Sequence, residues 1–322
     1  MQYRPIILCY HRISESNGTD INKLSVSPKN FRKHLEHLSL HRKFITLEEM
    51  AIAPLPNTVA ITFDDGYRDN CNIAANILTD FKIPASFFLA TRFIEYSINY
   101  YPSTFNTLWN FHTRRKSIPE VILGSPIEKL LREEVNYFRA LHKLSSNRPE
   151  MLWELSTILD SSQQNLGPVD KLDMPMSVSE VASLVSSDLF SIGPHTATHP
   201  RMSSIPIKEA MSDFAESIST VDKWGGSKTM FFPYPFGQGA DFNTLLEAEI
   251  NSRLNLNGLS TFPMAISRRN ANALTLPRLS VQDWEIDKFR NIVNMANAFS
   301  YVPIVATFAL KATAGIRKLR GI

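Results

Sequence analysis

Residues 59–67 read Val-Ala-Ile-Thr-Phe-Asp-Asp-Gly-Tyr, and this stretch decides the fold. Its first five residues are apolar or β-branched, which is typical of a buried parallel strand. The run ends in two adjacent carboxylates, Asp64 and Asp65, followed by a glycine. In an α/β sheet, chemistry is carried by the carboxyl ends of the strands. Asp-Asp-Gly is also ordinary turn chemistry, so the stretch by itself leaves a simple turn as an equal alternative.

A second short strand with a polar end lies at residues 190–200, which read Phe-Ser-Ile-Gly-Pro-His-Thr-Ala-Thr-His-Pro. His195 and His199 are four residues apart, a spacing at which two imidazoles can bind one ion. The alternative is two unrelated surface histidines. One carboxylate and two imidazoles make three protein ligands, which leaves a fourth position for water, as in a catalytic zinc site.

These motifs together resemble those of the polysaccharide deacetylase family, also called the NodB-homology or carbohydrate esterase 4 group. The resemblance is carried by Thr62-Phe63-Asp64-Asp65-Gly66 and His195-Thr196-Ala197-Thr198-His199, with Phe232-Pro233-Tyr234-Pro235-Phe236-Gly237 similar to the family's aromatic-proline-glycine loop. It implies a distorted (β/α) barrel with fewer than eight regular strands. It also implies a metal-dependent hydrolase that removes an N-acetyl group from an amino sugar, in a polysaccharide or a glycan precursor of the cell surface.

The resemblance assigns roles to individual residues. The ligands of one divalent metal ion, with zinc favoured, are expected to be Asp65, His195 and His199. Asp64 is expected to be the general base. The backbone N–H of Phe236 is the expected oxyanion contact, and Tyr234 of the same loop is expected to touch the substrate.

Two departures from the family pattern require substitutes. Pro233 stands where many members carry an arginine that orients the base, and Arg278 is a candidate for that role, with a plain surface residue as the alternative. No histidine follows His199, although many members supply an acid histidine near the C-terminus. His11 ends the first apolar run and resembles the histidine of members with a permuted motif order. We therefore expect His11 to be the general acid, with a buried structural histidine as the alternative.

Other functions stay open at this stage. The same barrel could hydrolyse an O-acetyl ester or another non-peptide amide, and a degenerate copy could bind glycan without chemistry. The net charge of +3 on 322 residues gives no reason to expect nucleic acid as a partner. The two cysteines imply neither a disulfide framework nor a cysteine metal site. The apolar run at residues 6–9 is too short for a signal peptide, so the expectation is a cytoplasmic protein.

Strand and helix patterns alternate along the chain, which predicts an α/β architecture with a parallel sheet. We expect one domain over residues 1–300, with a mostly helical insertion at about residues 92–175. Trp109 in that insertion is a candidate for stacking on a sugar ring, although core packing is the simpler reading. Residues 301–322 form an amphipathic, basic tail that either rests on the inner face of an anionic membrane or packs on the barrel.

Local signals predict several element boundaries. Ser27 and Pro28 predict the start of a helix, and Ser177 with Glu180 predicts a capping box. Helices are expected at residues 70–81, 207–224 and 240–251, and a strand at residues 259–266. His34, His37 and His41 follow helical spacing and are interpreted as a polar face.

Overall fold

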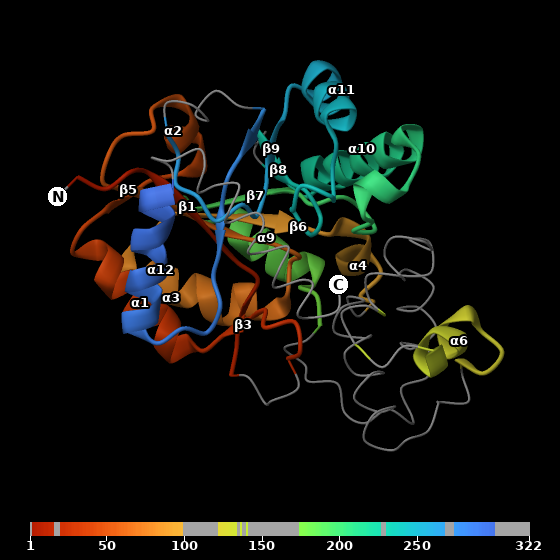
Figure 1. Ribbon diagram of the computed structural model, residues 1–322, viewed down its shortest axis with the longest axis horizontal. Helices are drawn as coiled ribbons and strands as arrows, with labels where there is room; N and C mark the ends of the chain where they lie inside the picture. Colours follow the sequence, from red (N-terminus) through yellow and green to blue (C-terminus); the bar gives the residue numbers. More distant parts are fainter. Residues whose placement is uncertain are drawn as a thin grey trace.

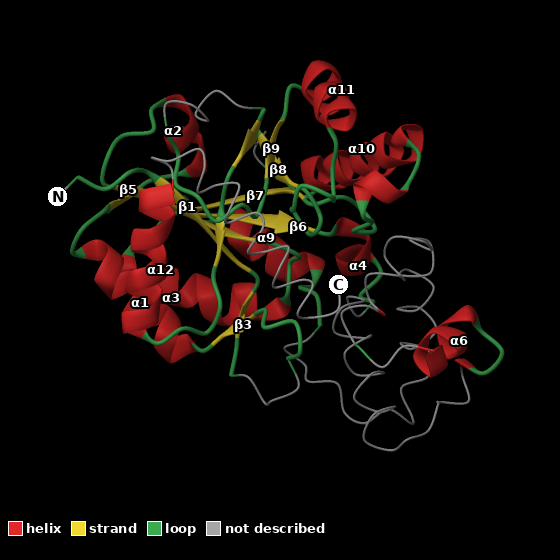
Figure 2. Ribbon diagram, viewed as in Figure 1, coloured by secondary structure: helices red, strands yellow, loops and turns green. Residues whose placement is uncertain are grey.

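The computed structural model describes residues 2–15, 20–98, 122–133, 136, 140, 174–226, 230–267 and 274–299. It is an α/β fold in which parallel strands lie at the centre and helices cover them (Figures 1 and 2). The predicted fold class is therefore confirmed.

The strands form two main sheets. In the described residues the larger sheet has the order β11-β1-β5-β6-β7, with β4 paired to β5, and the smaller has the order β10-β9-β8. The pairings between named strands are parallel. The strand bounds are β1 (Ile6–Tyr10), β4 (Lys43–Phe44), β5 (Thr58–Phe63), β6 (Ala85–Leu89), β7 (Phe190–Pro194), β8 (Phe231–Pro233), β9 (Asn257–Leu259), β10 (Thr275–Leu276) and β11 (Leu279–Ser280), with a separate pair β2 (Arg12–Ile13) and β3 (Ser25–Val26).

The two sheets share one interior because alternate residues of a strand point to opposite faces. One buried cluster draws on strands of both sheets, namely Ile7, Ala60, Phe88, Phe231, Leu259 and Leu276. Strand β7 lies beside β8, which brings the sheets together at one junction. The strands therefore curve around a common core as a distorted barrel. Among the described residues, no ladder of backbone hydrogen bonds joins the two sheets.

Helices cover the outer faces of the strands. The other alternate residues, among them Leu8, Ile61 and Phe87, pack in a second cluster against helices α1, α3, α9 and α12. Helices α10 and α11 pack on β8 through Phe214 and Leu246. The helix bounds are α1 (Pro28–Ser39), α2 (Leu47–Ile52), α3 (Asn76–Phe81), α4 (Thr91–Glu95), α6 (Pro126–Glu133), α9 (Val178–Val185), α10 (Ile207–Lys223), α11 (Thr244–Leu254) and α12 (Ile286–Phe299).

The predicted helix starts are confirmed where capping chemistry supports them. The Ser27 hydroxyl accepts the Asn30 N–H at 3.3 Å, with Pro28 as the first residue of α1. Ser177 and Glu180 form the expected capping box at the start of α9. A short polar side chain before a helix accepts an N–H that has no partner within it, which is why these signals are reliable.

The helical segment expected at residues 70–81 is confirmed in its bounds, with its first part, Asn70–Ala75, a π-helix that continues into α3. Two other boundaries were predicted incorrectly. The helix expected at 240–251 is α11, which begins four residues later because the Asn243 side chain caps it by accepting the Leu246 N–H at 2.9 Å. The strand expected at 259–266 is β9, which covers only residues 257–259, and soon after it the Thr261 N–H donates to the Gly237 carbonyl at 2.7 Å instead of to a neighbouring strand.

The interpretation of His34 as part of a polar face was wrong. Its side chain is fully buried between α1 and α12, and its ring stacks on Phe289 with 3.9 Å between ring centroids. Its Nε2 lies 2.7 Å from the Trp284 carbonyl oxygen. Burial lowers the pKa of His34 to about 4, because the charged form loses its hydration.

Part of the sequence interpretation concerns residues outside those that the structure describes. Of the expected insertion, α6 and the region around α4 are described, whereas Trp109 and the tail 301–322 are not. None of the helices formed by the described residues combines the length and apolar character needed to cross a bilayer.

Candidate active site

The candidate site lies where the parallel strands end. His11 follows β1, Asp64 and Asp65 follow β5, and His195 follows the last strand residues of β7. Parallel strands bring their carboxyl ends to one edge, so residues far apart in the sequence meet there. Asp64 is 2% exposed and Asp65 is 5% exposed, which is a costly position for two carboxylates unless each has a cationic partner.

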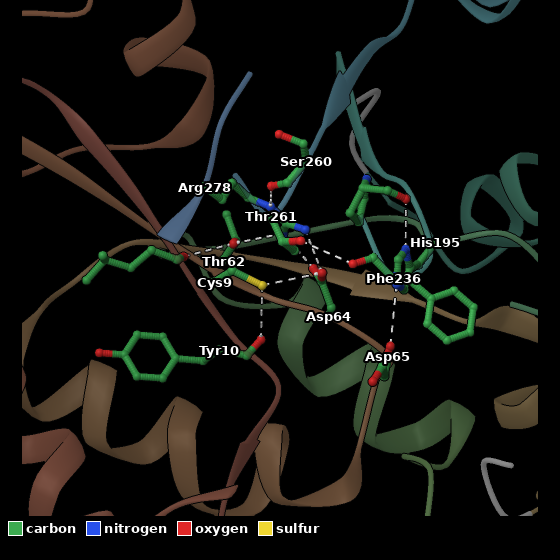
Figure 3. A network of polar contacts seen from close by, with 12 residues as sticks. Cys9, Tyr10, Thr62, Asp64, Asp65, His195, Phe236, Ser260, Thr261 and Arg278 are labelled. Atoms are coloured by element: carbon green, nitrogen blue, oxygen red, sulfur yellow. Dashed lines mark hydrogen bonds and ion pairs between the residues drawn. The ribbon is translucent and has the colours of Figure 1, made fainter. Parts of the chain in front are cut away.

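Asp64 is held by Arg278. The guanidinium Nη1 and Nη2 each donate to one oxygen of Asp64 at 2.7 Å, and the Arg278 side chain is completely buried (Figure 3). Arg278 also donates to the Thr62 hydroxyl and to the Ser260 carbonyl, each at 3.2 Å. Burial alone would raise the pKa of Asp64, but Arg278 and His195 hold it well below its usual range. Asp64 is therefore an ionised, oriented carboxylate.

Asp65 faces the other way and meets the two histidines. Its Oδ1 lies 3.4 Å from the Nε2 atoms of both His195 and His199 (Figure 3 shows the contact with His195). Burial would raise its pKa, but the contact with His195 and the charges of His199 and His11 keep the pKa of Asp65 below its usual value. Burial, reinforced by the neighbouring His195, lowers the pKa of His199 to about 3, so its ring is neutral at pH 7.

The loop that carries the histidines is fixed by its own backbone. The Nδ1–H of His195 donates to the Pro233 carbonyl at 2.9 Å, which leaves the Nε2 lone pair facing Asp65. The Thr196 hydroxyl accepts the His199 N–H at 3.0 Å. Asp213 of α10 accepts the N–H groups of Ala197 at 2.7 Å and of Thr198 at 3.1 Å. These bonds orient both rings before any ligand arrives.

Backbone strain concentrates at this site. Four residues other than glycine have a left-handed backbone here: Asp65 (φ 77°), Thr196 (φ 65°), His199 (φ 53°) and Phe236 (φ 64°). Such conformations cost of order 1 kcal/mol each and persist where surrounding contacts impose them. Gly66 (φ 82°) completes the turn, and a Cβ there would lie 2.9 Å from the Ile94 side chain. The left-handed backbone at Asp65 directs its carboxylate toward the histidines.

The ligand atoms of Asp65, His195 and His199 fit a divalent metal ion. They all lie within 4.8 Å of one another. Zinc bonds of about 2.0–2.1 Å at tetrahedral angles place neighbouring ligand atoms about 3.3 Å apart. The separations of 3.4 Å from Asp65 Oδ1 to the Nε2 atoms of His195 and His199 match this. Two nitrogen lone pairs beside one carboxylate are also the donor set that zinc prefers.

His11 lies beside Asp64 and is half-buried. One of its ring nitrogens lies within 4.8 Å of an Asp64 oxygen and of the Cys9 sulfur. Its Nδ1 is buried and has no hydrogen-bond partner among the described residues. The Asn70 side chain donates to the His11 carbonyl at 2.8 Å and fixes the backbone. The structure thus brings His11 to the same strand edge as the two aspartates.

The chain as a whole was compared with known proteins. A family model described as polysaccharide deacetylase matches residues 52–140 and 158–254, more than half of the chain. The chain belongs to the polysaccharide deacetylase family. No curated protein gives a significant match. The family match includes both aspartates and both histidines, whereas His11 and Arg278 lie outside the matched residues.

Solved structures show the same fold at low sequence identity. IcaB from Ammonifex degensii is 20% identical with a TM-score of 0.56, covering 92% of this chain and 97% of that one. PplD from Streptococcus pyogenes, a deacetylase solved with acetate, is 18% identical with a TM-score of 0.56, covering 88% and 94%. BC0361 from Bacillus cereus, a polysaccharide deacetylase, is 18% identical with a TM-score of 0.56, covering 91% and 69%.

In the third motif, Phe236 and Tyr234 have different surroundings. The ring of Phe236 lies beside His199, 5.3 Å between centroids, and the Arg201 guanidinium sits 4.5 Å above it. The Thr261 hydroxyl donates to the Phe236 carbonyl at 3.1 Å (Figure 3). Tyr234 is 1% exposed and stacks on Phe242 in the cluster under α10 and α11. A side chain this buried offers no surface to a sugar, so we do not propose Tyr234 as a substrate contact.

Two residues of the site region, Cys9 and Asp213, were not predicted from the sequence. The Cys9 thiol donates to Asp64 Oδ2 at 3.4 Å, and the period-2 alternation of β1 could have placed it inside the barrel with Ile7. Asp213 holds the histidine loop from a helix far along the chain. No local pattern announces that contact, because its partners are backbone N–H groups.

Proposed function

We propose that this member of the family is a metal-dependent hydrolase that removes an N-acetyl group from an amino sugar of a polysaccharide or glycan precursor. One observation carries the proposal: two adjacent buried carboxylates have separate partners, Asp64 with Arg278 and Asp65 with His195 and His199. Separate partners favour separate roles, one as base and one as ligand.

The proposed metal ligands are Asp65, His195 and His199, with zinc favoured. A bound divalent ion supplies a water of lowered pKa and polarises the acetyl carbonyl. His195 keeps its Nε2 available because its Nδ1–H is committed to the Pro233 carbonyl. Asp213 and the Thr196 hydroxyl hold the loop in the geometry in which both rings face Asp65.

Asp64 is the proposed general base. An ionised carboxylate accepts the proton of the attacking water, and Arg278 keeps Asp64 ionised and fixes the direction of its lone pairs. Arg278 acts through Asp64 and is therefore a positioning residue in this scheme. The N–H of Phe236, in a loop that Thr261 anchors, is the proposed donor to the oxyanion that forms on the acetyl carbonyl.

His11 is the proposed general acid. An amine leaves an amide only when it is protonated, and an imidazolium can donate that proton at neutral pH. The position of His11 at the same strand edge, with a buried Nδ1 that has no partner among the described residues, supports the assignment. The chain offers no histidine after His199 that could take this role.

The proposal also covers the substrate, the extent of the catalytic domain and the site of action in the cell. Proteins with this fold include a de-N-acetylase from Aggregatibacter actinomycetemcomitans. This supports an acetylated amino sugar as substrate. We infer one catalytic domain over residues 1–300, with the insertion 92–175 contributing Trp109 to sugar binding. The cytoplasmic site of action and the contact of tail 301–322 with a membrane surface stay predictions that cell fractionation would test.

Acetate release from a panel of N-acetylated and O-acetylated saccharides tests the function. We expect release from an N-acetylated sugar, loss of it on chelation, and recovery with zinc. Release from O-acetyl esters only would assign the esterase alternative instead. No release from either class, with metal bound, would leave a barrel that binds glycan without chemistry.

A further inference from the structure

A second group of metal-binding side chains lies next to the first. Cys9, His11 and Asp64 each offer one ligand atom, and these atoms lie within 4.8 Å of one another. Cys9 is on β1 and pairs with Thr62 of β5, so Cys9 and Asp64 come from neighbouring strands that share one register. None of the three belongs to the group formed by Asp65, His195 and His199.

The geometry of this group is that of metal ligands. The Cys9 Sγ lies 3.4 Å from Asp64 Oδ2. Bonds of about 2.3 Å from sulfur and about 2.0 Å from oxygen, at tetrahedral angles, place the two atoms about 3.5 Å apart. The third member, His11, has a buried Nδ1 with no hydrogen-bond partner among the described residues. One ring nitrogen of His11 is the ligand atom of this group, and the ring thus carries a buried nitrogen that no described residue satisfies.

We propose that Cys9, His11 and Asp64 form a second metal site, which takes a thiophilic divalent cation such as zinc or cadmium and inhibits the enzyme. On binding, the Cys9 S–H bond breaks, its proton leaves to solvent, and a sulfur–metal bond forms. His11 and Asp64 each contribute a lone pair. The thiolate sets this site apart from the first, because Asp65, His195 and His199 contain no sulfur.

The surroundings make the second site the weaker one. Arg278 donates to both oxygens of Asp64, and its positive charge opposes a cation nearby. The thiolate supplies compensating charge. Once the thiol has lost its proton, Asp64 Oδ2 accepts, among the described residues, only from Arg278 and keeps a lone pair for the ion. We therefore expect the first site to fill before the second. Occupancy of the second ties up the proposed base and the proposed acid together, which is why it inhibits.

Titration of cadmium chloride into zinc-loaded protein tests the site directly. A cadmium–thiolate bond gives an ultraviolet charge-transfer band, and cadmium that replaces zinc at the sulfur-free site gives none. We expect the band to appear and saturate in the wild type and in Cys71→Ser, and to be absent from Cys9→Ser. Cys71 is the matched control, because it is the chain's other cysteine and its thiol contacts the Glu180 carbonyl instead. No saturating band in the wild type, or a band lost with Cys71 instead of Cys9, overturns the proposal.

A second variant covers the case in which Cys9→Ser does not fold. His11→Gln removes one ligand and keeps both cysteines, so we expect the cadmium band with affinity reduced by about 10-fold or more. Unchanged cadmium affinity in this variant overturns the proposed ligand set. The spectroscopic result does not depend on the proposed function. The inhibition does: excess zinc should lower acetate release from the wild type, and should do so at higher concentration in Cys9→Ser. A shared inhibition curve would show that the second site does not inhibit.

Discussion

Asp64 and Asp65 are consecutive and both buried, yet they belong to two different halves of the site. The Asp64 side consists of Asp64, Arg278, Thr62 and Cys9, held together by direct hydrogen bonds inside the barrel. The Asp65 side consists of Asp65, His195 and His199, whose ligand atoms face one another at 3.4 Å across space that suits an ion. The Asp64 side is held by direct hydrogen bonds to a buried guanidinium, whereas the Asp65 side presents its ligand atoms to one another.

The difference arises from backbone direction. Asp64 continues the alternation of β5, so its side chain enters the interior that Thr62 also faces. Asp65 has a positive φ, which turns the chain so that the Asp65 carboxylate points toward the histidine loop. A turn of one residue therefore separates the proposed base, Asp64, from the proposed metal ligand, Asp65. The following predictions test this division.

The largest expected effect comes from exchanging each aspartate for asparagine. In protein loaded with one equivalent of zinc, Asp64→Asn should keep the ion proposed to bind on the Asp65 side, and should lose turnover by about 10²- to 10⁴-fold, the usual scale for a general base. Asp65→Asn should lose both metal and activity. Elemental analysis and acetate release measure the two effects. Asp80→Asn, an exposed aspartate that pairs with Arg32, is the control and should change neither. Loss of this metal from Asp64→Asn would contradict the division of the site into two halves.

Arg278→Gln should move the acidic limb of the kcat/KM profile to higher pH. In the wild type Arg278 holds the pKa of Asp64 low, so the ionised base persists as the pH falls. Without the guanidinium, burial raises that pKa and Asp64 becomes protonated at higher pH. Breaking a buried ion pair also costs about 3–5 kcal/mol of stability. Arg278→Lys keeps the charge without the two-bond geometry and should shift the limb less. An unshifted limb in both variants would contradict the role of Arg278.

A histidine outside both halves should control stability in acid. The folded-state pKa of His34, about 4, lies below the value of 6.5 for an unperturbed histidine, so protonation favours the unfolded state. The free energy of unfolding that depends on neutral His34 is fully present above pH 6.5. It is lost as the pH falls toward 4, by up to about 3 kcal/mol. Denaturant unfolding of wild type and His34→Gln across this range measures it. His41→Gln, an exchange at an exposed position just after the same helix, is the control. A wild-type stability that is flat over this range would refute the assignment.

The smallest effect concerns the anchoring of the Asp65 side. Asp213→Asn removes one acceptor from the histidine loop and should reduce metal affinity by about 10- to 100-fold, with little change in kcat once the site is saturated. Thr198→Val is the matched control, since it removes only the hydroxyl bond to Asp213, and should cost about 1 kcal/mol in stability with less effect on metal affinity. Metal affinity equal to wild type in Asp213→Asn would show that the loop holds its geometry without α10.

Motifs at strand ends could be predicted because their logic is local. Apolar runs followed by Asp64-Asp65 and by His195 mark exits from buried strands, and parallel strands bring such exits together. Helix starts at Ser27 and Ser177 were equally accessible, since a cap involves residues three apart. The extents of β9 and α11 were not, because the Thr261 N–H bonds to the Gly237 carbonyl just after β9 and the Asn243 side chain sets the start of α11.

The sequence by itself determined the fold class, the family and the two motifs that meet at the sheet edge, because each depends on residues close together in the chain. Only the tertiary structure decided which carboxylate faces Arg278 and which faces the histidines, and that Cys9 and Asp213 reach the site. The physical reason is that these contacts join residues up to 214 positions apart, through a strained turn at Asp65 and through backbone N–H groups that every sequence shares.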